Sequence, residues 1–212
     1  MENAVELRGV VAVLGGFPAL AGVDLDVRRG EVLLLQGPNG AGKTSLLRVC
    51  AGLLPVERGT GRVLGLDLVA DRERVRSRVG MLGHANGLYL DLTVRQNIRF
   101  WASTVGATDA EIADAMHRMN LDGRLADVKA EKLSAGQRRR CALASLVVRR
   151  AELWLLDEPH AGLDAAGRDE IDTVLRDAVL AGATVIVSSH ELERARSLAS
   201  RVVTVDGGTV RG

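Results

Sequence analysis

The hydrophobic residues of this chain form two kinds of pattern. Short apolar runs lie within 31–36, 153–156 and 183–188, and such runs are typical of strands buried on both faces of a parallel sheet. In the middle of the chain, within 93–119, the apolar side chains instead recur every three or four positions, as on one face of a helix. Buried strands that alternate with helices predict an α/β fold with a mostly parallel core sheet.

The N-terminal segment has a strand pattern of its own. Residues 5–13 are expected to form one strand, and residues 23–27 alternate apolar and polar side chains with the period of another. A turn signal at 29–30 predicts that this second strand pairs with the strand over 31–36. We therefore expect an N-terminal antiparallel β part beside the core sheet.

The helical middle is predicted to be an insertion into the strand pattern. Apolar spacing predicts a helix over 93–103, and a capping box at 108–111 predicts the start of a second helix. We expect a single domain whose core comprises roughly residues 1–83 and 150–212, with a helical subdomain at roughly 84–149.

After this insertion the chain returns to alternating strands and helices. The expected elements are a strand at 153–156, a helix at 167–180, a strand at 183–188, and a hairpin of 202–205 with 209–210.

A phosphate-binding pattern, G-x-x-x-x-G-K-[ST], joins the strand over 31–36 to a helix predicted over 45–51. It consists of Gly37, Pro38, Asn39, Gly40, Ala41, Gly42, Lys43 and Thr44. Its glycines allow backbone N–H groups to surround a polyphosphate at a helix N-terminus, so we expect these residues and Ser45 to bind a nucleotide. Lys43 is expected to reach the β and γ phosphates, and Thr44 to ligate Mg²⁺. The alternative is a glycine-rich turn that contains a lysine by chance.

Two acidic residues follow the apolar run at 153–156. Asp157, delivered beside the phosphate loop, is expected to hold Mg²⁺ directly or through water. Glu158 is expected to accept a proton from the water that attacks the γ-phosphate. Without the phosphate loop, the same pair would equally fit a solvated acidic turn.

The charge and composition of the chain exclude several classes of function. The 212 residues carry a formal net charge of +1, which gives no indication of a nucleic-acid surface. The N-terminus lacks the pattern of a secretory signal, and every apolar run is shorter than the about 18 residues that span a bilayer, so a membrane role is expected to come through a partner. Cys50 and Cys141 form no C-x-x-C pair and are interpreted as buried thiols in a reducing compartment.

A further motif, L-S-x-G-Q at residues 133–137, lies between the phosphate loop and the acidic pair, and Ser189-His190 follows the run at 183–188. These motifs in this order, over essentially the whole chain, resemble the ATP-binding cassette (ABC) ATPase family. The resemblance implies a P-loop NTPase fold, ATP and Mg²⁺ as ligands, and a homodimer that closes around ATP. Taken alone, L-S-x-G-Q would fit a helix cap, and a histidine after a strand is usually structural.

The family's motifs also imply roles for individual residues. Ser134 and Gly136, with Gln137 in the same motif, would contact the γ-phosphate bound by the other subunit. His190 would hydrogen-bond the γ-phosphate and orient Glu158 together with the attacking water. Asp164 matches the loop through which the two subunits couple, and it could also cap the helix that begins near residue 165.

Three positions differ from the commonest cassette. Leu14 replaces the aromatic ring that stacks on adenine, with Phe17 three residues later, so we expect weak selectivity for the base. His84 replaces the glutamine that meets the Mg²⁺ or attacking water and senses the membrane partner, and it is counted among the nucleotide-binding residues. Ala135 replaces the usual glycine of the L-S-G-G-Q motif.

The segments Gly83-His84, 133–140 and 153–159 together resemble one branch of the family, the CcmA-type ATPases of haem exporters in cytochrome c maturation. The resemblance implies a peripheral protein on the cytoplasmic face of the cell membrane, bound to a membrane-spanning CcmB-like subunit, with a CcmC-like subunit as a second candidate partner. No C-x-x-C-H motif occurs, so we do not expect haem to bind this chain. The alternative is the ATPase of another small exporter of drugs or lipids.

Proteins of other classes fit less well. A DNA-repair or chromosome-organising ATPase of the ABC type would carry long coiled-coil heptads before L-S-x-G-Q, and this chain has none. A ribosome-associated ABC protein would have two cassettes, and a small-molecule kinase would not need L-S-x-G-Q. We therefore expect no nucleic-acid partner.

Overall fold

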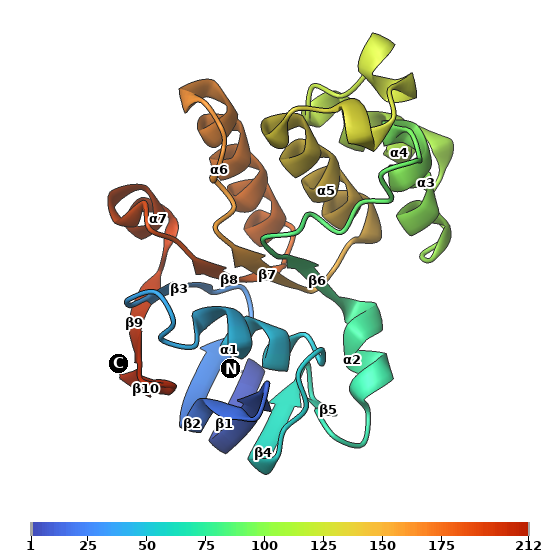
Figure 1. Ribbon diagram of the computed structural model, residues 1–212. Coiled ribbons are helices and arrows are strands. Elements are labelled where there is room, and N and C mark those ends of the chain that lie inside the picture. The colour runs from blue at the N-terminus through green and yellow to red at the C-terminus, as the bar shows by residue number, and fades with distance from the viewer. Residues whose placement is uncertain (1, 212) are drawn as a thin grey trace.

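The computed structural model describes residues 2–211 and has a six-stranded sheet at its centre (Figure 1). Its strands are, in spatial order, β10 (Thr209–Arg211), β9 (Arg201–Asp206), β3 (Val32–Gln36), β8 (Thr184–Ser188), β7 (Leu153–Asp157) and β6 (Val79–Leu82). All neighbours are parallel except the hairpin of β9 with β10. The predicted α/β fold with a mostly parallel core sheet is confirmed.

A second, antiparallel sheet comes from the N-terminal part of the chain. Its order is β2 (Phe17–Arg28), β1 (Asn3–Leu14), β4 (Arg58–Val63) and β5 (Leu66–Asp67). The expected pairing of 23–27 with the strand over 31–36 is wrong, because β2 pairs with β1. β3 has parallel neighbours on both edges, β8 and β9, so it has no edge left for β2.

The helices lie between the sheets and on the far face of the central sheet. They are α1 (Lys43–Cys50), α2 (Arg72–Arg78), α3 (Val94–Ser103), α4 (Asp109–Arg118), the 3₁₀ turns η1 (Gly123–Asp127) and η2 (Ala130–Lys132), α5 (Ala135–Arg149), α6 (Ala165–Leu180) and α7 (Leu192–Leu198). Figure 1 shows α1 between the two sheets, while α5 and α6 cover the opposite face of the central sheet. Helices α3 and α4 stand to one side of α5.

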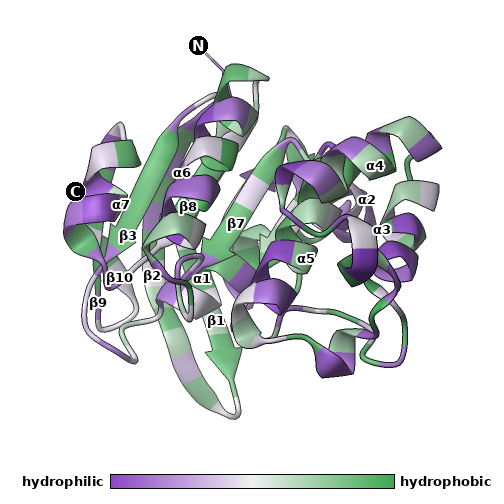
Figure 2. Cartoon of the chain, turned by 90° about the horizontal axis from the view of Figure 1, so that it is seen from above, coloured by the Kyte–Doolittle hydropathy of each residue, from purple (hydrophilic) through white to green (hydrophobic). Residues whose placement is uncertain are grey.

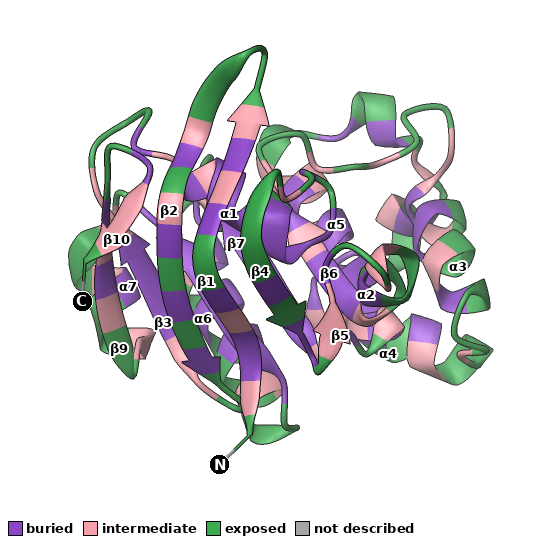
Figure 3. Ribbon diagram, turned by 90° about the horizontal axis from the view of Figure 1, so that it is seen from below, coloured by how far each residue is buried: buried purple, intermediate pink, exposed green. Residues whose placement is uncertain are grey.

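The central sheet separates two hydrophobic cores, which explains the continuous apolar runs. Leu33 and Leu35 of β3 pack into the core shared with α1 and the antiparallel sheet, whereas Leu34 packs into the core beneath the helices. β7 alternates in the same way, with Leu155 on one side and Trp154 on the other. Figure 2 shows hydrophobic residues running along β3 and β7. In Figure 3 buried and exposed residues alternate along β2, as in a sheet covered on one side.

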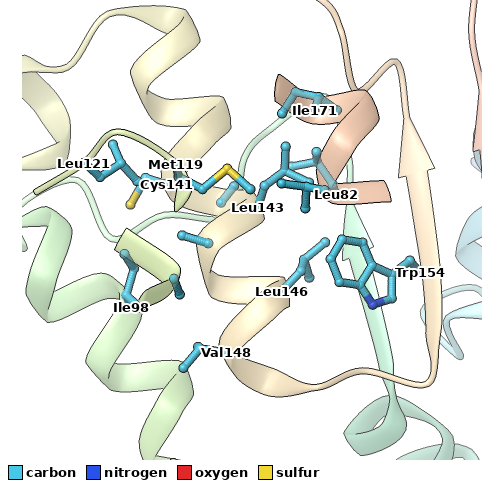
Figure 4. Close-up of a cluster of buried hydrophobic side chains, with 14 of the residues drawn as sticks. Leu82, Ile98, Met119, Leu121, Cys141, Leu143, Leu146, Val148, Trp154 and Ile171 are labelled. Carbon is cyan, nitrogen blue, oxygen red and sulfur yellow. The ribbon is translucent and has the colours of Figure 1, made fainter. Parts of the chain in front are cut away.

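Helix α5 is the centre of the helical core. Figure 4 shows Leu146 of α5 between Ile98 on one side and Trp154 on the other. The capping box predicted at residue 108 is confirmed, since the Thr108 side chain accepts a hydrogen bond from the Glu111 backbone N–H. Cys141 lies fully buried in α5, and burial raises the pKa of its thiol to about 12, as expected for an unreactive core thiol.

Candidate active site

Parallel strands bring the predicted site residues to one edge of the central sheet. In the strand register Leu35 of β3 lies beside Ser188 of β8, and Ser188 lies beside Asp157 of β7. The phosphate loop after β3 therefore meets the residues that end β7 and β8. This edge, outside the carboxyl ends of parallel strands, is the usual ligand site of α/β sheets.

The phosphate loop requires glycine at two positions where its backbone comes very close to the backbone of another segment. Gly37 has φ +141°, and a Cβ there would lie 2.0 Å from the backbone oxygen of Val205. Gly42 has φ +109°, and a Cβ there would lie 2.8 Å from the backbone oxygen of Ala19. Gly42 is also the N-cap of α1 and carries no side chain to cap the helix, so the N–H groups of the first turn remain available for an anion.

Lys43 places its ammonium group inside the loop. Its side chain is only 7% exposed, and Nζ donates hydrogen bonds to the backbone oxygens of Gly37 at 2.7 Å and Pro38 at 2.9 Å. These contacts fix a positive charge beside the free N–H groups of α1. The loop can therefore bind a polyphosphate through both its backbone and this cation.

A hydroxyl–carboxylate network follows the loop. Thr44 Oγ1 donates to Asp157 Oδ2 at 2.7 Å, and Ser188 Oγ donates to Asp157 Oδ1 at 2.5 Å. The sequence analysis did not identify Ser188, although its position at the end of an apolar strand directly before Ser189-His190 could have indicated it. The result is a buried carboxylate with a threonine hydroxyl against it, both of them oxygen ligands suited to a small divalent cation.

Glu158 and His190 face each other across the ends of β7 and β8. The His190 backbone N–H donates to Glu158 Oε2 at 3.0 Å, and His190 Nε2 lies 3.4 Å from Glu158 Oε1. Oε1 itself is buried and accepts no hydrogen bond. Glu158 adopts φ +52°, a left-handed conformation that is costly for a residue with a side chain and that is often found at functional positions.

These residues line a cleft of about 720 Å³. Its lining residues are Leu14, Phe17, Pro18, Ala19, Asn39, Gly40, Gly42, Lys43, Thr44, Ser45, His84, Asp157, Glu158, His190, Gly207 and Gly208. The volume lies within the usual range for small-molecule sites. Most of the predicted nucleotide-binding and catalytic residues thus share one cleft, including His84.

Leu14 and Phe17 lie at the mouth of this cleft, directly opposite each other. Gly15 and Gly16 form the turn of the β1–β2 hairpin, so Leu14 and Phe17 are cross-strand partners. The Phe17 side chain is 77% exposed. An aromatic ring is therefore available at this end of the cleft, although it comes from the strand opposite the aligned position.

The L-S-x-G-Q motif does not reach the cleft of its own chain. Ser134 is the exposed N-cap of α5, and its hydroxyl accepts from the Gln137 backbone N–H at 3.2 Å. The Gln137 side chain accepts from the Ser134 backbone N–H at 2.9 Å, which completes a capping box. Ser134, Gly136 and Gln137 consequently form a separate helix N-terminus on the surface.

The segment after Glu158 is anchored by a buried network. His160 Nε2 lies 2.8 Å from Asp172 Oδ1 of α6, and Arg194 of α7 binds the other oxygen of Asp172. Asp164 caps α6 by accepting from the Gly167 backbone N–H at 2.9 Å, as the sequence analysis expected. These contacts hold the segment that follows Glu158 and, through Arg194, the helix that follows His190.

A second groove, of about 320 Å³, lies between the core and the α3–α5 segment. Leu88, Trp101 and Arg149 are among its lining residues, and the Arg149 guanidinium lies 4.5 Å from the centre of the Trp101 ring. Leu88 packs against the helical core, while Tyr89 is 46% exposed and meets Phe100 edge to face. Within residues 2–211, no helix is long and apolar enough to cross a membrane.

Known families and structures match both the sequence and the fold. The protein family described as "ABC transporter" matches residues 20–161. The chain is 41% identical over 196 residues to "Cytochrome c biogenesis ATP-binding export protein CcmA 2" of Cupriavidus metallidurans, covering 90% of this chain and 92% of that protein. It is 38% identical over 215 residues to "Daunorubicin resistance ATP-binding protein DrrA3" of Streptomyces coeruleorubidus, covering 99% of this chain and 67% of that protein.

A solved structure shares the fold. It is the dimeric post-hydrolysis state of an ATP-binding cassette bound to ADP and Pi, with a TM-score of 0.89 at 24% identity, covering 98% of this chain and 97% of that one.

Proposed function

The chain belongs to the ABC transporter family, and from this membership we propose that it is the ATP-hydrolysing subunit of a CcmA-type haem exporter that acts in cytochrome c biogenesis. The strongest support is the 41% identity to a CcmA protein over nine-tenths of both chains. The DrrA3 relative is less similar and longer than this chain, but it keeps a drug exporter as the second candidate.

ATP is proposed to bind with its phosphates on the loop from Gly37 to Thr44. The N–H groups at the start of α1 and the Lys43 ammonium group supply the positive field that a triphosphate needs. Ser45 and Asn39 line the same cleft. The residues present also fit Mg²⁺, because Thr44 and Asp157 already bring a hydroxyl and a carboxylate oxygen within 2.7 Å of each other. Bound there, Mg²⁺ would neutralise charge on the phosphate oxygens.

Glu158 is proposed as the general base for the attacking water. Glu158 lines the cleft, and its Oε1 accepts no hydrogen bond, which leaves this oxygen free to take a proton. His190, which faces this carboxylate, is proposed to hold Glu158 and to donate a hydrogen bond to the γ-phosphate. Glu158 has a left-handed backbone conformation, with φ +52°, and it lines the cleft.

We propose that a second copy of the chain completes each site. Ser134, Gly136 and Gln137 form a helix N-terminus outside their own cleft, with Ser134 exposed and Gly136 and Gln137 half-buried, which suits contact with a γ-phosphate held by a partner. In this arrangement the chain acts as one domain. Residues 1–83 and 150–212 hold the nucleotide, and the helical segment 84–149 presents the motif to the partner.

A CcmB-like membrane subunit, with a CcmC-like one, is the proposed transport partner. The groove lined by Leu88 and Trp101 lies beside the loop that carries His84 and is apolar enough to receive a helix. Docking there would hold the chain on the cytoplasmic face of the membrane and would link partner movement to His84 at the cleft.

Truncation of Tyr89 tests this docking surface. Tyr89→Ala should lower co-purification with the membrane subunit severalfold, because an exposed aromatic side chain contributes strongly to interfaces. Val69→Ala, at a position that is exposed elsewhere on the chain, serves as the control. Thermal unfolding is measured alongside, and unchanged co-purification by a stable Tyr89→Ala chain would place the partner elsewhere.

The base of the nucleotide is proposed to contact Phe17 as well as Leu14. Stacking contributes roughly 0.5–1.5 kcal/mol beyond burial, so Phe17→Ala should weaken ATP binding by roughly two- to tenfold. Leu14→Ala, which removes the cross-strand partner but no ring, should have a smaller effect. Fluorescence titration with ATP and GTP checks both variants. Equal affinities for the wild type and the Phe17→Ala chain would show that no stacking occurs there.

Deletion of the gene in its native organism separates the two candidate exporters. The proposal predicts loss of covalently haem-bound c-type cytochromes, restored by the wild-type gene and not by a Glu158→Gln gene. Normal cytochromes together with new sensitivity to a drug would instead favour the drug exporter.

A further inference from the structure

Arg139 is a buried cation that binds only neutral acceptors. Its side chain in α5 is 4% exposed. One guanidinium nitrogen donates to the Gly83 backbone oxygen at 2.8 Å and to Asn86 Oδ1 at 3.0 Å. The other donates to the backbone oxygens of Asp157 at 3.3 Å and Glu158 at 2.5 Å. One side chain thus joins three segments: α5, the loop after β6 and the end of β7.

Burial of the Arg139 guanidinium without an ion pair costs free energy, which other interactions must offset. Burial lowers the pKa of the Arg139 guanidinium, and the negative charges of Asp157 and Glu158 only partly oppose this effect. Charged side chains are almost never fully buried without an oppositely charged partner, because removal of the charge from water is costly. The fork geometry of arginine, with parallel donors, suits the bridging of several carbonyl groups.

The two arginines next to Arg139 on α5 make contacts of other kinds. Arg138 donates to the backbone oxygens of Ala130 and Glu131, outside the cleft. Arg140 pairs with the Glu170 carboxylate of α6. Of the three consecutive arginines, Arg139 alone contacts the end of the strand that carries the candidate base.

We infer that Arg139 is a positioning residue, which holds the backbone turn at Glu158 and ties it to the loop that carries His84. The inference rests on the proposed function of the cleft. Glu158 has φ +52°, and its carbonyl oxygen accepts from both Arg139 and the Ala161 backbone N–H, so these bonds stabilise a conformation that the residue would not otherwise prefer. The other nitrogen of the fork binds Gly83, the residue next to His84.

This link predicts the path of a conformational signal. A shift of the loop at Gly83 and Asn86 moves the acceptors of one guanidinium nitrogen, and the rigid planar fork transfers that shift to the carbonyl groups of Asp157 and Glu158. The base then moves relative to the phosphate loop, whose own contacts to Lys43 do not involve Arg139. Loss of the fork should therefore slow hydrolysis and leave ATP binding intact.

The test uses two variants of Arg139. Arg139→Met keeps the apolar stem of the side chain, and Arg139→Lys keeps its charge. Arg138→Met is the matched control. ATP affinity, kcat and KM are measured for each chain alone and with its membrane subunits, and thermal unfolding is recorded in parallel. We expect Arg139→Met to lower kcat by about ten- to a hundredfold, the size of effect that follows a misplaced catalytic group. ATP affinity should stay within about threefold of wild type.

Arg139→Lys should recover part of kcat but not the stimulation by the membrane subunits, and Arg138→Met should behave as wild type. If Arg139→Met does not fold, the lysine variant alone decides, by its kcat at unchanged ATP affinity. Wild-type kcat and stimulation in either Arg139 variant would overturn the inference, as would a loss of ATP affinity equal to the loss of kcat. A wild-type chain that hydrolyses no ATP would instead contradict the proposed function itself.

Discussion

A Glu158→Gln chain is expected to bind Mg-ATP with nearly wild-type affinity and to hydrolyse it at least about a hundredfold more slowly, the usual contribution of a general base. The amide keeps the size of the side chain and its oxygen can still accept from the His190 backbone N–H, but it cannot take a proton from water. If two chains close around ATP as proposed, the variant should also remain a dimer, because its ATP stays intact.

Size-exclusion chromatography with and without Mg-ATP measures the dimer, and phosphate release measures the rate. Glu193→Gln, which neutralises an exposed carboxylate on α7, serves as the control. Rapid hydrolysis by the Glu158→Gln chain would remove this residue from the chemistry. Slow hydrolysis without an ATP-dependent dimer would argue against the proposed pairing of two chains.

Replacement of Lys43 by alanine is expected to remove most of the ATPase activity, by about a hundredfold, since each hydrogen bond to a charged group contributes about 1.5–3 kcal/mol. In contrast to Glu158→Gln, this variant should also bind ATP more weakly. The reason is that, among residues 2–211, Lys43 supplies the only ammonium group that lines the cleft.

The chain contains only two other lysines, and one of them, exposed Lys129, gives a matched control. Lys129→Ala should retain wild-type phosphate release when assembled with the same membrane subunits. Near-wild-type activity in Lys43→Ala would exclude the proposed role of the phosphate loop.

Much of the core could be predicted because its determinants are local. The runs around Leu34 and Leu155 are apolar on both faces, which only a doubly covered strand requires, and the phosphate loop is defined by glycines at fixed spacing. Asp157 and Glu158 could be placed at the end of β7 for the same reason, because they directly follow one of these apolar runs. Parallel register then places Asp157 against Thr44, more than a hundred residues earlier in the chain, as the motif order implied.

Other features depend on contacts that no local pattern encodes. The turn at 29–30 indicated a hairpin of β2 with β3, yet both edges of β3 are occupied by strands from the C-terminal part of the chain. Likewise, Phe17 looked misplaced by sequence position. Only the two-residue turn of the β1–β2 hairpin brings it opposite Leu14.

Arg139 was not recognised because its role depends on distant acceptors. In the sequence it is one of three consecutive arginines after L-S-x-G-Q, and no local pattern distinguishes it from the other two. The fold buries the middle one against Gly83 and Glu158, which lie far from it along the chain.

The central claim is that the chain hydrolyses ATP in a cleft completed by a second copy of itself. Phosphate release by the purified wild-type chain, at saturating Mg-ATP and over a wide range of protein concentration, tests this most directly. We expect phosphate release per chain to rise with protein concentration and to reach a plateau once dimers predominate. The reason is that Ser134 and Gly136 lie outside the cleft of their own chain. Activity per chain that is independent of concentration down to monomeric protein, or no phosphate release at any concentration from protein that binds ATP, would contradict it.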